Sequence, residues 1–124
     1  MSTPWPDGLP DAIVIADDLK ISPLRADGRT YGTPTWIWCV RVDDDLYVRA
    51  YHGPSSRWYA AALARPDGRI HAAGHVLAVT VEPAPESLAD RIDAAYRDKY
   101  AGSPYLAPML ADGPRAACFR ILPR

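Results

Sequence analysis

Arg49 has the clearest potential for ligand chemistry, because it lies between Tyr47 and Tyr51 in a strand-like segment. A guanidinium group matches a phosphate or a carboxylate through two parallel hydrogen bonds. The pattern therefore predicts an anion ligand. The structural alternative is an arginine that is exposed on the strand, stacked on a tyrosine or paired with an aspartate.

A second candidate for anion binding follows at Ser55, Ser56 and Arg57, which open a predicted short helix over residues 57–65. Backbone amides at a helix N-terminus favour anions. The simpler interpretation is that Ser55 or Ser56 caps the helix. The two interpretations are compatible, since a bound anion often uses the same amides.

Tryptophan side chains are the candidates for stacking on a flat ring. Trp58 is the best placed of them, although docking of the helix would also explain this residue. Trp36 and Trp38 fall on the apolar face of a predicted strand, so we interpret them as core residues. Tyr31 and Thr35 flank the entrance of that strand, where ligand contact and turn packing are both open.

Metal and thiol chemistry are not indicated. His52, His71 and His75 do not follow the spacing of a zinc site. Cys39 and Cys118 lie far apart in strand-like sequence, with no adjacent histidine or helix start that would lower their pKa. We therefore expect two reduced, buried thiols and no metal.

A hairpin must position the candidate arginine. Residues 36–42 and 46–51 give the strongest strand patterns, and three aspartates separate them. A three-residue loop would pair Val42 with Leu46. One face would then be core, with Trp36, Trp38, Val40, Val42, Leu46, Val48 and Ala50. The other, partly buried face would hold Ile37, Cys39, Arg41, Tyr47, Arg49 and Tyr51. A one-residue slip would change the partners but not the alternation within each strand.

The remaining elements are short. An edge strand, or a strand that ends in a bulge, is expected at 19–25, because Pro23 cannot donate to a ladder. A second hairpin turns at Gly74 between 69–73 and 76–81, and a closing strand covers 115–122. Asp11 could cap a helix over 12–18, although that segment also suits a strand.

The best helical pattern lies between Ser87 and Gly102. Its apolar residues recur at helical spacing: Leu88, Ile92, Ala95, Tyr96 and Tyr100. Ser87 and Asp90 resemble a capping box, and Asp93 can pair with Arg97 one turn later. Residues 98–100 and Tyr105, at the end of this helix, could close one rim of a pocket.

Composition narrows the class of protein. The 124 residues fit one domain, 1–124, with a loosely ordered tail at 1–10. The 14 Lys and Arg residues against 15 Asp and Glu argue against a nucleic-acid partner. We expect no membrane span and a cytoplasmic location. About six strands and two helices predict an α+β fold, mainly antiparallel, curled into a small barrel.

Several segments resemble a known bacterial family, the domain of unknown function 2255. The segments are 31–38, 46–51, 56–59, 95–109 and 115–124, in order along residues 19–124. That family is similar to the split β-barrels that bind flavin mononucleotide (FMN) or an F420-type deazaflavin. The resemblance implies a split barrel, often a homodimer, with a cofactor site between the barrel and a helix or between subunits.

The resemblance also implies a flavin- or deazaflavin-dependent oxidoreductase that acts on a small molecule. Arg49, Ser55, Ser56 and Arg57 would hold the phosphate, with Tyr51 and Trp58 against the ring. No glycine-rich phosphate loop accompanies them. One alternative is a barrel without cofactor that binds or converts an aromatic or anionic ligand through Arg, Tyr and Trp side chains. A third is a homodimer whose aromatic face is only an interface.

Overall fold

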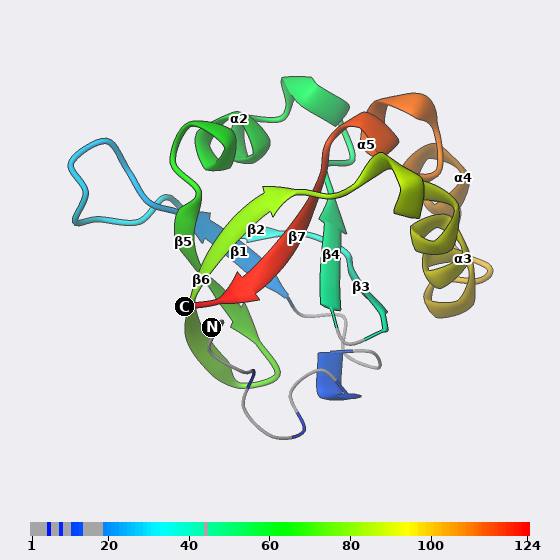
Figure 1. Ribbon diagram of the computed structural model, residues 1–124, viewed down its shortest axis with the longest axis horizontal. Coiled ribbons are helices and arrows are strands. Elements are labelled where there is room, and N and C mark those ends of the chain that lie inside the picture. Colours follow the sequence, from blue (N-terminus) through cyan, green and yellow to red (C-terminus); the bar gives the residue numbers. More distant parts are fainter. Residues whose placement is uncertain (1–4, 6–7, 9–10, 14–18, 44) are drawn as a thin grey trace.

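Seven strands form one antiparallel sheet in the part of the chain that the computed structural model describes, residues 5, 8, 11–13, 19–43 and 45–124 (Figure 1). The strands are β1 (Lys20–Pro23), β2 (Thr35–Trp36), β3 (Cys39–Val42), β4 (Asp45–Arg49), β5 (Asp67–Ala72), β6 (His75–Pro83) and β7 (Cys118–Pro123). Their order across the sheet is β2-β1-β5-β6-β7-β4-β3. The helices are η1 (Gly53–Ser55), α2 (Arg57–Ala64), η2 (Glu86–Leu88), α3 (Ala89–Lys99), α4 (Leu106–Met109) and α5 (Asp112–Ala116).

The sheet is curled, because its two edge strands are almost continuous in the chain. β2 ends at Trp36 and β3 begins at Cys39. Three residue steps span at most roughly 11 Å, whereas the edges of seven flat strands would lie roughly 29 Å apart. The two edges must therefore approach each other, which makes the sheet a half-barrel. This confirms the predicted α+β, mainly antiparallel, barrel-like class.

The predicted strand over 36–42 is interrupted, which is why the sheet has seven strands. The backbone N–H of Ile37 donates to the carbonyl of Leu19 at 3.1 Å, so this part of the segment belongs beside β1. Two residues later, Cys39 pairs with Val48 of β4. The segment changes partner between these points and passes from one edge of the sheet to the other.

The register of the β3–β4 hairpin corrects the predicted one. Val42 pairs with Asp45, and Val40 pairs with Tyr47, so the loop has two residues instead of three. Two-residue loops need positive φ angles, which match the twist of the strands. Asp43 adopts such an angle, φ 55°. The slip places Tyr47 on the same face as Val40.

The two faces of β4 are both buried. Leu46 and Val48 point into the barrel, in a cluster that Tyr59 and Ala62 of α2 complete. Tyr47 lies on the outer face, in a second cluster with residues of α3. The helices α3, α4 and α5 gather on this side of the sheet (Figure 1).

The prediction that both tryptophans are core residues is wrong for Trp36, whose relative exposure is 61%. Trp38 is half-buried, and its ring stacks on that of Tyr100 with 3.8 Å between centroids. The apolar alternation predicts one continuous strand over residues 36–42, but the strand is interrupted at Ile37 and Trp38, so Trp36 does not lie on the face that packs on α3.

The other local predictions have mixed outcomes. The helix after Ser56 and the hairpin at Gly74 are confirmed as α2 and as β5–β6. The capping box is wrong, because η2 includes Ser87 and no side chain caps α3. β1 is not an edge strand, since β2 pairs with it. The closing strand begins only at Cys118, because α5 occupies the preceding residues.

The predicted helix over 12–18 and the tail 1–10 fall mostly outside the described residues, although residues 11–13 are helical. Nowhere in the described ranges does a helix combine enough length with enough apolar character to span a bilayer.

Gly68 should be essential for the pairing of β5 with β1. A Cβ atom at this position would lie 2.8 Å from the carbonyl oxygen of Ser22, a backbone atom that cannot move away easily. We expect Gly68→Ala to lower the free energy of unfolding in urea by about 1–3 kcal/mol, as overpacking does. Gly32→Ala is the matched control, because its Cβ would meet its nearest atom at 3.5 Å. Equal stabilities of the two variants would contradict this account.

Candidate functional site

Five of the six predicted ligand residues line one cavity of about 660 Å³, which we call the aromatic pocket. The pocket is formed where the β2–β3 segment, the end of β4, the start of α2 and the α3–α4 connection meet. Its lining residues are Thr35, Trp36, Ile37, Trp38, Arg49, Tyr51, His52, Ser56, Arg57, Trp58, Ser103, Tyr105 and Met109. Its size is typical of small-molecule sites.

Ser55 is the predicted residue that does not line the aromatic pocket. Its Oγ donates to the carbonyl oxygen of His52 at 2.9 Å, which stabilises η1. Ser56 is the N-cap residue of α2 and is buried, but its side chain makes no capping hydrogen bond. Arg57 is exposed at the first position of α2. Among the described residues, no carboxylate lies within ion-pair distance of Arg57.

The start of α2 is held in place by a close backbone approach. Gly53 has φ +70°, and a Cβ atom there would lie 3.2–3.3 Å from the backbone of Gly113. A side chain would therefore separate η1 from α5. The pair of glycines fixes the loop that carries Ser56 and Arg57 into the aromatic pocket.

Aromatic rings surround the mouth of the pocket. Tyr51 makes edge contacts with His52 and Tyr105, at centroid distances of 5.2 and 6.0 Å. Trp58 is half-buried, and the centroid of its ring lies 6.1 Å from that of Phe119. The sequence hypothesis of a rim near the end of the long helix is supported for Tyr105. Tyr100, in contrast, is buried.

Tyr31 does not line the aromatic pocket; its ring packs under the guanidinium of Arg69 at 4.1 Å. Of the two residues that flank the strand entrance, only Thr35 contributes to the pocket among those described. The turn-packing interpretation therefore holds for Tyr31.

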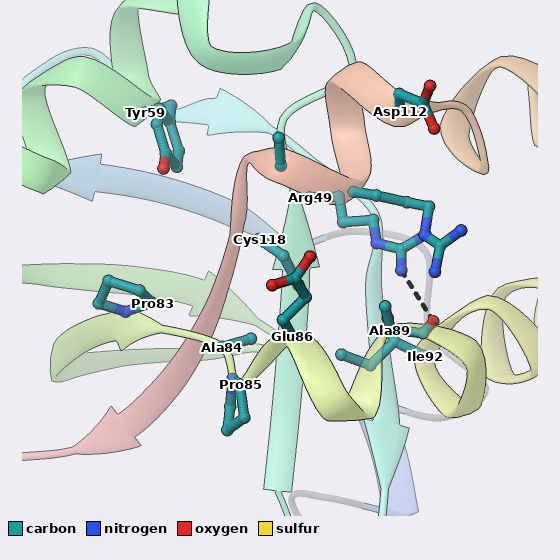
Figure 2. A pocket seen from close by; sticks show the side chains of 12 residues that line it. Arg49, Tyr59, Pro83, Ala84, Pro85, Glu86, Ala89, Ile92, Asp112 and Cys118 are labelled. Carbon is teal, nitrogen blue, oxygen red and sulfur yellow. Dashed lines mark hydrogen bonds between the residues drawn. The ribbon is translucent and has the colours of Figure 1, made fainter.

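A second cavity, of about 570 Å³, is also lined by Arg49 (Figure 2). We call it the arginine pocket. Its lining residues are Arg49, Tyr59, Pro83, Ala84, Pro85, Glu86, Ala89, Ile92, Asp112, Arg115, Ala116 and Cys118. Among the described residues, Arg49 is the one that both cavities share.

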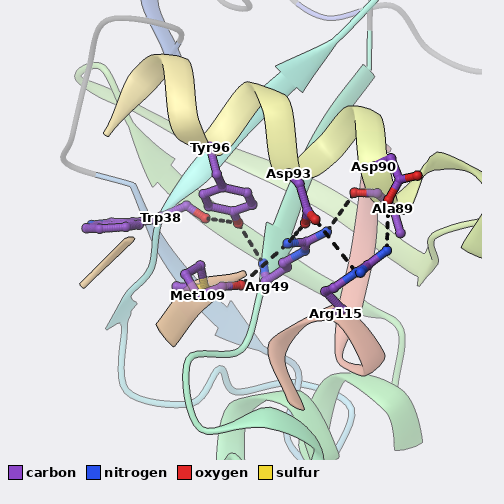
Figure 3. A network of polar contacts seen from close by, with 8 residues as sticks. All are labelled: Trp38, Arg49, Ala89, Asp90, Asp93, Tyr96, Met109 and Arg115. Atoms are coloured by element: carbon purple, nitrogen blue, oxygen red, sulfur yellow. Dashed lines mark hydrogen bonds and ion pairs between the residues drawn. The ribbon is translucent and has the colours of Figure 1, made fainter. Parts of the chain in front are cut away.

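Arg49 is the centre of a buried polar network (Figure 3). Its side chain is fully buried, and Nη1 pairs with Oδ1 of Asp93 at 2.5 Å. Nη2 donates to the carbonyl oxygen of Ala89 at 3.1 Å. The backbone N–H of Arg49 donates to the hydroxyl of Tyr96, which itself donates to the carbonyl of Trp38. The network ties β4 and the β2–β3 segment to α3.

The structural alternative for Arg49, pairing with an aspartate, is therefore present. Its role as an anion ligand stays a prediction, and its Nε is buried with no hydrogen-bond partner in the described structure. The predicted pairing of Asp93 with Arg97 is wrong, because Asp93 lies on the buried face of α3 beside Ile92 and Tyr96. A carboxylate within an apolar helical face needs a buried cation, and this signal could have identified the partner of Arg49.

A second arginine approaches the same carboxylate, and the sequence reasoning missed it. Arg115 pairs with Asp90 at 3.1 Å, and its Nε lies 3.8 Å from Oδ2 of Asp93. Asp93 thus lies between two guanidinium groups (Figure 3).

The two cysteines are free thiols; Cys39 is buried, as expected, whereas Cys118 is only partly buried. Burial raises the pKa of Cys39 to about 12. Burial also raises the pKa of Cys118 to about 11, although the guanidinium of Arg49 lowers it in part. Both thiols are neutral at physiological pH and are poor nucleophiles. Within the described ranges, no three His, Cys, Asp or Glu side chains are grouped to hold a metal ion.

The fold and the cavities define an α+β half-barrel with a cavity of about 660 Å³ between the β2–β3 segment, the end of β4 and the start of α2. The family model described as "Uncharacterized protein conserved in bacteria (DUF2255)" matches residues 11–121, and the chain belongs to this family. The expected family is confirmed. Among curated proteins, the comparison found none that matches.

A solved structure supports the fold. The chain is similar to the crystal structure of the conserved hypothetical protein Rv2991 from Mycobacterium tuberculosis, with a TM-score of 0.62 and 12% sequence identity. The similarity covers 98% of this chain and 80% of the other. At 12% identity, this similarity supports the fold and does not identify a ligand.

Asp93→Asn should strongly destabilise the protein, because it leaves the buried guanidinium of Arg49 without a counter-charge. Breaking a buried ion pair in this way typically costs about 3–5 kcal/mol. Urea denaturation followed by circular dichroism would measure the loss. Asp98→Asn, at an exposed position of the same helix, is the control and should have little effect. A small effect of Asp93→Asn would show that the pair does not hold β4 to α3.

The raised pKa values predict slow alkylation of both cysteines in the folded protein. At pH 8 a thiol with a pKa of about 11 has only ~0.1% thiolate, roughly two hundredfold less than an unperturbed cysteine. The rate with iodoacetamide should rise about tenfold per pH unit between pH 8 and 10. The same measurement in urea gives the unperturbed rate. Rapid labelling of the folded protein at pH 8 would contradict the burial of these thiols.

Proposed function

We propose that the protein binds FMN or an F420-type deazaflavin in the aromatic pocket and acts as an oxidoreductase on a small molecule. The observation that carries this proposal is the lining of that pocket. Five aromatic side chains and Arg57 surround one cavity of about 660 Å³. The aromatic residues are Trp36, Trp38, Tyr51, Trp58 and Tyr105.

The residues present fit a planar ring with an anionic group. The cavity volume lies within the range of about 300–1,000 Å³ that is usual for small-molecule and cofactor sites. Trp36 and Trp58 offer flat surfaces on which a ring system can stack. Arg57 and the first backbone amides of α2 offer a cation and hydrogen-bond donors for a phosphate.

The chemistry would divide between the cofactor and the protein. A bound flavin or deazaflavin supplies hydride transfer, while the protein binds and orients it. Trp36 and Tyr105, more than half exposed at the mouth, would exclude water from the ring face and shape the space for a substrate. Arg49 holds the pocket wall through Asp93.

A second candidate is a barrel that binds an aromatic carboxylate without any cofactor. The observation that favours it is the pairing of Arg49 with Asp93, which leaves Arg57 as the arginine of the pocket that no described carboxylate neutralises. One such cation suffices for a carboxylate, whereas a phosphate usually has several donors. The same aromatic residues would then orient the ligand.

Titration with FMN, riboflavin and a deazaflavin separates the candidates, with fluorescence as the readout. We expect Arg57→Gln to weaken FMN binding about tenfold, the loss of one charge-assisted contact. Riboflavin, which lacks the phosphate, should be unaffected by this change. Arg65→Gln, at the other end of α2, is the matched control. Absence of binding by FMN and the deazaflavin, with the protein folded, would contradict the cofactor proposal. Binding of benzoate that depends on Arg57 would then support the second candidate.

The homodimer is likewise a proposal, and the exposed aromatic side chains at the mouth support it. Trp36 and Tyr105 are 61% and 58% exposed. Sedimentation equilibrium at micromolar concentration tests it directly. A monomer would exclude the interpretation of these residues as an interface and would leave ligand binding as the reason for their position. A cytoplasmic location stays a prediction of the sequence.

A further inference from the structure

Trp36 lines a third cavity in addition to the aromatic pocket, and we call this cavity the lysine pocket. Its volume is about 590 Å³. The described residues that line it are Lys20, Pro34, Trp36, His71, Ala72, Gly74, His75 and Val76. Among the described residues, Trp36 alone belongs to both linings. The lysine pocket is thus a site of its own that meets the proposed cofactor site at Trp36.

The register of four strands places the main lining residues in one row across the sheet. Trp36 of β2 pairs with Lys20 of β1, which also pairs with His71 of β5. His71 in turn pairs with Val76 of β6. Directly paired side chains lie on the same face of a sheet, with Cβ atoms about 4.5–5.5 Å apart. The next row along these strands belongs to the core inside the barrel, so the row of Lys20 lies on the outer face.

Lys20 gives this outer face a positive charge that the lining does not neutralise. Its side chain is exposed, and within the described part of the chain no carboxylate lies within ion-pair distance of it. None of the described residues that line the cavity is acidic. His75, which is also exposed, adds an imidazole N–H donor. The polar groups of the lysine pocket therefore favour an anion.

The two ends of the row are large apolar side chains that are left exposed. Trp36 is 61% exposed and Val76 is 59% exposed. These side chains offer apolar surface to a ligand on both sides of Lys20. Lys20 is the one fixed cation of the described lining, and one cation matches a carboxylate, whereas a phosphate usually has several donors. The lining is thus suited to a molecule that combines an apolar body with one carboxylate.

We propose that the lysine pocket binds an organic monocarboxylic acid. Its carboxylate pairs with Lys20 and accepts a hydrogen bond from His75, and its apolar part lies on Trp36 and Val76. An amine of the same shape would be repelled by Lys20, and an alcohol would not form the ion pair. Because Trp36 also lines the aromatic pocket, such an acid is the substrate class of the oxidoreductase. This assignment as substrate rests on the proposed function, whereas the binding site does not.

NMR titration of the ¹⁵N-labelled full chain tests the site without any cofactor. The probes are hexanoate, hexanol and hexylamine, which share one alkyl chain and differ in charge. We expect hexanoate to bind about fivefold more tightly than hexanol, the contribution of one exposed ion pair, and hexylamine to bind more weakly than hexanol. Hexanoate should shift the amide signals of Lys20 and Val76 and the indole signal of Trp36. The indole signal of Trp58 should not change, because Trp58 lines the aromatic pocket and not the lysine pocket.

Variants of Lys20 assign the charged end. Lys20→Gln should reduce the affinity for hexanoate to that for hexanol and leave hexanol unaffected, whereas Lys20→Arg, which keeps the charge, should retain the preference. Arg29→Gln, an exposed change outside the cavity, is the control. The proposal is overturned if hexanoate and hexanol bind equally, if Lys20→Gln has no effect, or if the shifts are confined to residues of the aromatic pocket.

The same titration at saturating FMN tests the assignment as substrate. We expect hexanoate and FMN to bind together, with the indole signal of Trp36 shifted by each and that of Trp58 shifted by FMN. Exclusion of hexanoate by FMN would overturn this assignment. If FMN does not bind, the proposed function and the assignment as substrate both fail, and the response to hexanoate alone still decides whether the lysine pocket is an acid site.

Discussion

The buried pair between Arg49 and Asp93 is the interaction on which the rest of the structure depends. It joins β4, the strand with two buried faces, to α3, the longest helix among the described residues. A buried pair of this kind is stable only when both partners and their remaining donors are satisfied. Ala89 and Tyr96 supply further contacts from the same helix. The pair therefore fixes Arg49, which lines both cavities.

The curl of the sheet then determines which residues surround the aromatic pocket. Because β2 and β3 are the opposite edges of the sheet and are joined by two residues, the chain between them crosses the open side of the half-barrel. Trp36 and Trp38, which belong to this connection, therefore line the aromatic pocket. Gly53 and Gly113 bring the start of α2 to the same place. The aromatic pocket is thus a product of the topology and of one close backbone contact.

The sequence predicted the parts of this site that depend on local patterns. The hairpin, the helix after Ser56 and the group from Tyr51 to Trp58 follow from turn chemistry and alternation. The sequence-based predictions failed where the position of a residue depends on partners that are distant in the sequence. Trp36 has the same spacing whether its strand is continuous or changes partner after Ile37. The sequence suggests Arg97, one turn later on the helix, as the partner of Asp93. Arg49 is 44 residues away in the sequence, and only the packing of α3 on β4 brings it to Asp93.

A crystal structure of the protein grown with FMN tests the central claim, that the aromatic pocket binds a flat anionic ligand while the Arg49–Asp93 pair holds its wall. The account predicts the ring system against Trp36 or Trp58, the phosphate at Arg57 and the start of α2, and Arg49 still paired with Asp93. A ligand bound elsewhere, or a phosphate that draws Arg49 away from Asp93, would contradict it.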